Sequence, residues 1–336
     1  MEQLHRGRQS ILFTDRPVVK AWASVVGKKE GEGPLSGAFD RVISEGKYGE
    51  KTWEQAETKL QQTALELLLE KAGLERDALD LVFSGDLLNQ CVGSSYALRR
   101  SGIPALGLYG ACSTMAEGLL LAGAAVNASY VNYAAALSSS HFAAAERQYR
   151  FPLAYGGQRT PTAQWTVTGA GAVLLAKSGR GPVLTAATVG TVEDKGITDA
   201  NNMGAAMAWA AYRSIRTHLE DLALAPEDYD RIVTGDLGQL GSDILQECFA
   251  GDGVKLGARY TDCGLRIYSR EAQDVHCGGS GAGCSAAVLA AELLPGFTTG
   301  RWKRILFCGT GALLSPTTVQ QKRSIPAICH CVAIEN

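Results

Sequence analysis

One short pattern occurs twice in this 336-residue chain and limits the folds that it can adopt. The stretch DALDLVFSGDLLNQ begins at Asp77, and the stretch EDYDRIVTGDLGQL begins at Glu227. Each contains an aspartate, a short run of apolar and β-branched residues, and then Ser or Thr followed by Gly-Asp-Leu. A run of this kind is typical of a buried β-strand that ends in a polar turn. The repeat therefore predicts two strands in equivalent positions of two related halves.

A helix of similar design precedes each of these predicted strands. Residues Thr52–Ala72 place apolar side chains at helical spacing, with a capping box at the start and Gly73 as the stop. Residues Met203–Leu222 repeat the design, with Asn201 or Asn202 as the N-cap. The two halves therefore share a helix as well as a strand.

A second pair of motifs extends the repeat. The stretch GACSTMAEGLLLAG from Gly110 resembles GAGCSAAVLAAELL from Gly281. Each is followed by a predicted strand rich in small residues, YAAALSSS from Tyr133 and RILFCGTGALLSP from Arg304. Each half thus contains a strand, a small-residue loop, a buried helix and another strand.

These repeats predict a layered α/β fold made of two similar halves, residues 1–180 and 181–336. Helices would cover both faces of each sheet. The loops that follow the strands of the two halves would then meet at one crevice. Asp86 and Cys112 lie on such loops in the first half, and Asp236 lies on one in the second.

Cys112 lies in a Gly-Ala-Cys-Ser-Thr stretch, directly before a helix predicted over Met115–Val126 with Ser113 or Thr114 as its cap. The positive end of a helix dipole favours a thiolate, and its N–H groups can hold an oxyanion. The alternative is that Cys112 is a small buried thiol before a core helix, which is the commoner role of a cysteine. The local sequence leaves both interpretations open.

Composition excludes some classes of function. A net charge of −2 without a long basic run argues against nucleic-acid binding. Nine cysteines without framework spacing, and a start that lacks the apolar core of a signal peptide, indicate a reducing compartment. No apolar run approaches the roughly 18 residues needed to span a bilayer. We therefore expect a cytoplasmic fold that reaches a membrane only through other proteins.

Several motifs resemble a known superfamily. The two halves, the Gly-Ala-Cys-Ser-Thr stretch, TVTGAGAVLLAK from Thr166 and CGTGALLSP from Cys308 are similar to the thiolase-like proteins, which include thiolases and ketoacyl synthases. The chain more closely resembles one branch, the stage V sporulation protein AD family of spore-forming bacteria. The resemblance rests on an ordered set of stretches along nearly the whole chain, including EGPLSGAFD, WEQAETKL, SGDLLNQ, GITDANNMGAAMA, TGDLGQLGSDIL, GGSGAGCSA and TGALLSPTTVQQKRSIPAICH.

This resemblance implies a thiolase-like αβαβα fold and a homodimer formed through sheet edges. It also implies binding of dipicolinic acid (pyridine-2,6-dicarboxylic acid) without a cofactor or a metal. The protein would act with other stage V sporulation A membrane proteins to move that acid into the developing spore. It would lie at the periphery of the spore inner membrane through those partners.

Thiolase and ketoacyl synthase chemistry needs more than Cys112. In this superfamily the second half also supplies two polar groups, usually His with Asn or a second His, for proton transfer and oxyanion stabilisation. The corresponding loops read TGDLGQ around Asp236 and GGSGAGCS before Cys284, without a histidine, and His218 is expected on the exposed face of its helix. We therefore expect no thiolase activity. The alternatives are a 3-oxoacyl synthase III-like acyltransferase with Cys112 as the nucleophile, and a scaffold without a ligand.

Dipicolinate has a flat ring with two carboxylates and needs hydrogen-bond donors at both ends. Arg147 can grip a carboxylate with two parallel bonds, or pair instead with Glu146 and other surface acids. His141 and Arg150 are further candidate donors, although a lone histidine at a strand end is more often structural. We expect the ligand between Asp86 and Cys112. The predicted ligand-binding residues are Asp86, Asn89, Cys112, Ser113, His141 and Arg147.

Overall fold

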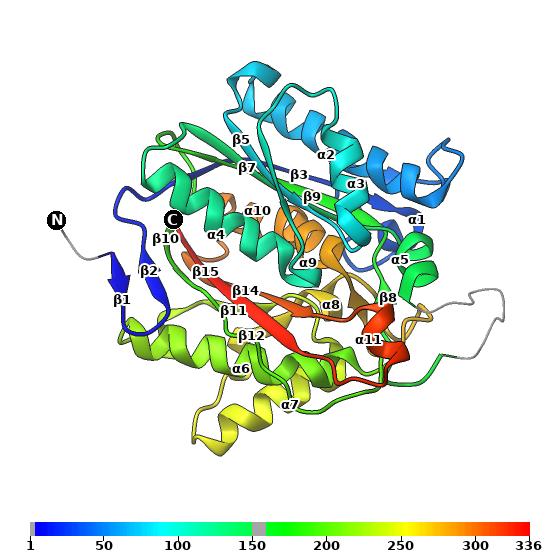
Figure 1. Ribbon diagram of the computed structural model, residues 1–336. Coiled ribbons are helices and arrows are strands. Elements are labelled where there is room, and N and C mark those ends of the chain that lie inside the picture. The colour runs from blue at the N-terminus through cyan, green and yellow to red at the C-terminus, as the bar shows by residue number, and fades with distance from the viewer. Residues whose placement is uncertain (1–3, 150–158) are drawn as a thin grey trace.

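The strands of the protein form two half-sheets that repeat one arrangement (Figure 1). The structure is a computed structural model, and it describes residues 4–149 and 159–336. The first half-sheet consists of β3 (Val18–Gly27), β5 (Leu81–Gly85), β6 (Ala105–Leu108), β7 (Tyr133–Ser140) and β9 (Gly169–Ala176). The second consists of β10 (Val183–Thr188), β11 (Arg231–Thr234), β12 (Tyr260–Asp262), β14 (Arg304–Ala312) and β15 (Ala327–Glu335).

Short strands and helices complete the described chain. The short strands are β1 (His5–Arg6), β2 (Ser10–Leu12), β4 (Arg41–Ile43), β8 (Trp165–Thr166) and β13 (Gly279–Ser280). The long helices are α2 (Trp53–Ala72), α4 (Thr114–Asn127), α6 (Met203–Asp221) and α7 (Gly238–Gly251). The shorter helices are α1 (Lys28–Gly31), α3 (Val92–Leu98), α5 (Phe142–Tyr149), α8 (Cys263–Arg266), α9 (Ala282–Val288), α10 (Leu294–Thr298) and α11 (Pro316–Gln320).

The order of the strands shows the repeat directly. It is β6-β5-β7-β9-β3 in the first half-sheet and β12-β11-β14-β15-β10 in the second. β5 and β11 therefore hold equivalent positions, as the Gly-Asp repeat predicts, and they are followed by the buried residues Asp86 and Asp236. The half-sheets join where Val183 in β10 pairs with Val18 in β3. β2 crosses the predicted boundary at residue 180, since it pairs with β10 of the second half-sheet.

The helices and half-sheets stack as alternating layers (Figure 1). α2 packs on the outer face of the first half-sheet, and α6 packs on the outer face of the second. α4 and α9 lie between the half-sheets, where Met115, Leu119 and the whole of α9 are buried. The repeats predict helices on both faces of each sheet, and the result is the helix–sheet–helix–sheet–helix order that the resemblance implies.

Two of the predicted helix caps are confirmed. Thr52 and Gln55 form the capping box at the start of α2, and Gly73 ends that helix in the left-handed conformation, with φ of 64°. The side chain of Asn202 accepts a hydrogen bond from the backbone N–H of Ala205 at the start of α6. These local signals fix both outer helices at the residues expected.

The predicted cap of α4 is wrong. The hydroxyl groups of Ser113 and Thr114 donate to the carbonyl oxygens of Gly110 (2.6 Å) and Ala111 (2.7 Å) instead of accepting from the helix. A one-turn 3-10 helix over Ala111–Ser113 precedes α4 and places these carbonyls within reach of both side chains.

The structure also corrects the prediction for His218, which is fully buried. Its Nδ1 and Nε2 atoms form hydrogen bonds with the hydroxyl groups of Thr188 (2.7 Å) and Tyr229 (2.6 Å). Burial lowers the pKa of His218 to about 3. Within the described part of the chain, no helix combines the length and apolar character required to cross a membrane.

Burial of neutral His218 predicts a specific loss of stability in acid. Below pH 6.5 the unfolded chain takes up a proton that the folded protein does not bind until about pH 3, so stability falls as the pH falls through this range. At pH 5 this linkage costs about 2 kcal/mol. We expect His218→Gln to lose less thermal stability than the wild type between pH 7 and pH 5, measured by calorimetry. Equal losses of thermal stability in His218→Gln and in the wild type would contradict this prediction. His5→Gln, which changes an exposed histidine, is the control.

Candidate functional site

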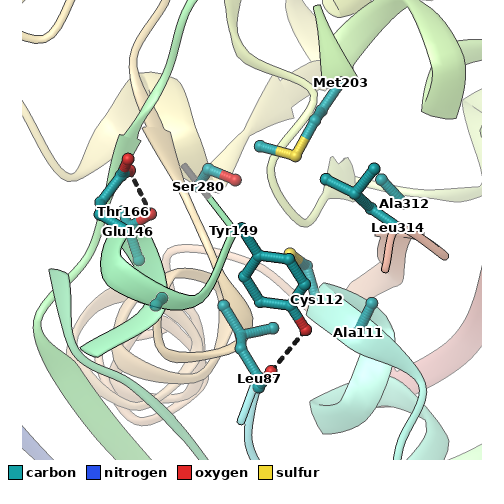
Figure 2. Close-up of a pocket in the computed structure, with 11 residues that line it drawn as sticks. Leu87, Ala111, Cys112, Glu146, Tyr149, Thr166, Met203, Ser280, Ala312 and Leu314 are labelled. Atoms are coloured by element: carbon teal, nitrogen blue, oxygen red, sulfur yellow. Dashed lines mark hydrogen bonds between the residues drawn. The ribbon is translucent and has the colours of Figure 1, made fainter. Parts of the chain in front are cut away.

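A cavity that is open to solvent lies where the loops of the two halves meet (Figure 2). The first half contributes Leu87, Ala111, Cys112, Glu146, Tyr149 and Thr166 to its described wall. The second half contributes Met203, Ser280, Ala312 and Leu314. Leu87 follows β5, Ala111 and Cys112 follow β6, and Met203 begins α6, so loops of both halves contribute to the cavity as the repeat predicts.

Cys112 lies at the wall of this cavity and is 5% exposed. The preceding residue, Ala111, has a positive φ of 52°, a conformation that is uncommon for a residue other than glycine. Ser280 of the second half lines the cavity together with Cys112, and Asp236 and Gly281 of the same half lie near enough to shift the pKa of Cys112. The site is therefore built by both halves.

Asp236 is held by a dense set of donors. The hydroxyl of Thr310 donates to its Oδ1 atom at 2.7 Å. The hydroxyl of Ser280 and the backbone N–H of Gly281 both donate to Oδ2 at 2.9 Å. Burial raises the pKa of Asp236, and these hydrogen bonds oppose that rise.

The surroundings of Cys112 disfavour a thiolate. Burial raises the pKa of Cys112 well above its usual range, and the carboxylate of Asp236 raises it further. The N–H of Gly281 and the hydroxyl of Ser280 lower this pKa but do not offset the rise. Burial and the carboxylate of Asp236 therefore oppose the helix dipole, which favours a thiolate at Cys112.

The remainder of the cavity wall is apolar or carries hydroxyl groups, apart from the carboxylate of Glu146. Tyr149 lies next to Cys112, and its hydroxyl donates to the carbonyl oxygen of Leu87 at 2.6 Å (Figure 2). The hydroxyl of Thr166 donates to the buried carboxylate of Glu146 at 3.0 Å. None of the wall residues that the structure describes is a lysine, an arginine or a histidine.

Asp86 does not reach the cavity. It is fully buried behind Leu87, and it accepts hydrogen bonds from the N–H of Leu88 (2.9 Å) and from the N–H and hydroxyl of Ser94 (both 2.7 Å). Burial raises the pKa of Asp86. Its role in the described structure is to hold the turn that presents Leu87 to the cavity.

Asn89 and Arg147 lie together, but in a separate surface depression. Arg147 forms an ion pair with Glu54 and not with Glu146. Residues three apart on a helix share a face, so α5 turns Glu146 and Tyr149 toward the cavity and Arg147 away from it. Arg150 lies outside the described residues.

Ser113 and His141 also point elsewhere. The hydroxyl of Ser113 is bound to Gly110, beneath the start of α4. The Nε2 atom of His141 forms a 2.8 Å hydrogen bond with the carbonyl oxygen of Gly46, and the His141 ring lies 5.5 Å from that of Trp53. Burial lowers the pKa of His141. Of the six predicted ligand-binding residues, the structure therefore places Cys112 in the cavity wall and the other five outside it.

Several wall residues were not among the predicted ligand-binding residues. Glu146 and Tyr149 were identifiable from their spacing on one helix face, although the sequence alone does not say which face of α5 meets the cavity. Met203 and Thr166 lie in stretches that resemble the family and carry no chemical signal of their own. In the described residues, no group of three or more His, Cys, Asp or Glu side chains is placed to hold a metal ion.

Comparison with known proteins identifies the family. The sequence model described as "Stage V sporulation protein AD (SpoVAD)" matches residues 7–335. The chain is 44% identical over 329 residues to stage V sporulation protein AD of Bacillus subtilis (strain 168), which covers 98% of this chain and 97% of the relative. The chain belongs to the stage V sporulation protein AD family. Its link to sporulation and the predicted resemblance are both confirmed.

Solved structures confirm the thiolase-like fold. The 3-oxoacyl-(acyl carrier protein) synthase III of Xanthomonas oryzae pv. oryzae matches with a TM-score of 0.61 and 14% identity, over 97% of this chain and 100% of that one. The corresponding synthase of Aquifex aeolicus VF5 gives a TM-score of 0.58 and 13% identity, over 95% and 100%. A variant of OleA from Xanthomonas campestris gives 0.60 and 15%, over 97% and 99%. At identities this low, the match to these structures supports the fold alone.

Proposed function

We propose that the cavity at Cys112 binds dipicolinic acid, and that the protein assists uptake of this acid into the developing spore without thiolase or ketoacyl synthase chemistry. The protein would act at the spore inner membrane through other stage V sporulation A proteins. The observation that carries the proposal is the composition of the site. Cys112 shares the cavity wall with Ser280, and Ser280 donates to the buried carboxylate of Asp236, where the fold's enzymes need a neutral or cationic donor.

The second half offers poor catalytic partners to Cys112. A developing oxyanion or enolate beside Asp236 would meet a like charge in a buried site, where charge repulsion is strong. Ser280 can donate a hydrogen bond, but its hydroxyl is directed to Asp236. These features support binding over acyl transfer.

The shape and chemistry of the wall suit a flat ring with polar ends. Tyr149 supplies an aromatic face, and Leu87 and Met203 supply apolar walls for the ring. Ala111 and Cys112 place the positive end of α4 at the cavity wall, which favours a carboxylate.

Calorimetric titration with dipicolinate tests the proposal. We expect saturable binding to the wild type and none of acetyl-CoA. Tyr149→Ala should weaken binding by about 1.5 kcal/mol, because the aromatic face is lost. Cys112→Ala should weaken it by only about 1 kcal/mol, the contribution of one neutral contact.

Arg147→Ala distinguishes the ligand-binding residues predicted from the sequence from those that line the cavity in the structure. The sequence-based set of residues predicts a large loss of dipicolinate affinity, since hydrogen bonds to charged groups contribute roughly 1.5–3 kcal/mol. The cavity geometry predicts no change, because Arg147 faces Glu54 outside the cavity. Circular dichroism would confirm that each variant folds. Acylation of Cys112 by acyl-CoA, without dipicolinate binding, would favour the alternative function as an acyltransferase. Binding of neither ligand would favour a scaffold without a ligand.

We also propose that two copies of the chain pair through β6. This strand ends the first half-sheet in the described structure, and its residues Ala105–Gly107 are exposed. Leu106 is 53% exposed and the neighbouring Tyr109 is 52% exposed. An edge strand with unpaired backbone groups and apolar side chains favours association with a second strand.

Analytical ultracentrifugation at micromolar concentration measures this association. The wild type should sediment as a dimer of the 35.5 kDa chain. Leu106→Asp should shift it to the monomer, since two like charges would face each other across the paired strands. Val42→Asp serves as the matched control, because Val42 is an exposed apolar residue that lies on β4 and not on β6. This variant should remain dimeric. A monomeric wild type would contradict the proposal.

A further inference from the structure

A second depression in the surface lies where the end of α3 meets α2. Three arginines line it, Arg76, Arg99 and Arg100, and Glu66 is the one acid among its described lining residues. We call it the arginine depression. It shares no described lining residue with the cavity at Cys112, so it is a separate feature of the first half.

The charges of the arginine depression are not balanced within the described chain. A guanidinium nitrogen of Arg76 lies 3.1 Å from the carboxylate of Glu66, so these two charges form an ion pair. Neither Arg99 nor Arg100 has a carboxylate of the described residues within ion-pair distance. Two positive charges therefore remain at one concave place, where the N–H groups of both guanidinium side chains can meet an anion.

The backbone at the end of α3 presents these two arginines together. Arg99 is the C-cap residue of the helix, and its guanidinium lies 4.7 Å from the centre of the Tyr96 ring, which restrains the side chain. Arg100 has a positive φ of 72°, which is uncommon for a bulky residue. The hydroxyl of Ser101 accepts from the N–H of Ile103 at 3.1 Å and keeps its own O–H for donation into the depression.

The corresponding place in the second half holds a carboxylate instead. α2 and α6 cover equivalent faces of the half-sheets, and α3 and α7 each precede the edge strand of their half-sheet. The C-cap residue of α7 is Asp252, where α3 has Arg99. Asp252 accepts a hydrogen bond from Tyr212 of α6 at 2.5 Å and lies 3.6 Å from a guanidinium nitrogen of Arg216 in the same helix. The second half thus supplies its own anion at this place.

We propose that the arginine depression is a binding site for a phosphate group. Arginine binds phosphate through parallel N–H···O bonds, and a phosphate monoester offers three acceptor oxygens and a charge near −2 to match Arg99 and Arg100. The phosphate group belongs either to a soluble compound or to the headgroup of an anionic lipid. This inference goes beyond the proposed function and does not depend on it.

Calorimetric titration of the full-length protein with inorganic phosphate, at constant ionic strength, tests the proposal. The wild type should show saturable binding. The double variant Arg99→Ala/Arg100→Ala should bind at least about tenfold more weakly, because it loses hydrogen bonds to a charged group. Glu66→Gln should bind about threefold more tightly, because it removes the acid of the depression and releases Arg76 from its ion pair.

Arg259→Ala is the matched control, since it removes an exposed arginine from the turn that precedes β12, the equivalent edge strand of the second half. Its affinity for phosphate should equal that of the wild type. The alternative role of Arg99 and Arg100 is to stabilise the end of α3 through the helix dipole. That role predicts a loss of thermal stability in the double variant without a change in phosphate binding, and no gain in Glu66→Gln.

Either of those two results would overturn the proposal, as would the absence of phosphate binding to the wild type. Glu66 is exposed, so Glu66→Gln keeps the proposal testable if the double variant does not fold. Flotation with vesicles of phosphatidylglycerol, compared with phosphatidylcholine, identifies the source of the phosphate group. Flotation with phosphatidylglycerol that the double variant loses would assign a lipid headgroup, and phosphate binding without flotation would assign a soluble compound. Dipicolinate is absent from these measurements, so failure of the proposed function would not alter them.

Discussion

The close packing of two central helices between the half-sheets is the constraint on which the rest of the molecule depends. A side chain at Gly171 of β9 would collide with the backbone of Ala286 in α9, and one at Gly309 of β14 would collide with Ala116 in α4. Only glycine lets the strands approach the helices this closely. This packing brings the first turn of α4 and the residues before it against the second half, which places Cys112 near Asp236.

The contact between the halves determines the chemistry of the site. Cys112 stands where a helix dipole alone would favour a thiolate, yet its neighbours from the second half include a buried carboxylate. The penalty for ionising two adjacent buried groups exceeds the effect of the dipole. Side chains of the second half can therefore change the chemistry of a site within this fold, because they shift the pKa of the Cys112 thiol.

The sequence predicted the features that local chemistry controls, and it failed where tertiary packing decides. Thr52 and Asn202 cap their helices as expected, because capping depends on residues within one turn. Asp86 is a different case, because its Gly-Asp motif predicted a pocket residue but α3 covers it with the hydrogen bonds of Ser94. His218 was expected in solvent, although Thr188 of β10 and Tyr229 supply buried hydroxyl partners. The sequence within one helix turn does not determine which part of the chain will pack over a side chain. It likewise does not determine which face of α5 lines the cavity.

A crystal structure of the protein grown with dipicolinate tests the central claim most directly. The account predicts electron density for the ring beside Tyr149, with one carboxylate directed to the start of α4 and no covalent bond to the sulfur of Cys112. Density for the ligand in the depression beside Asn89 and Arg147, with an empty cavity at Cys112, would contradict it.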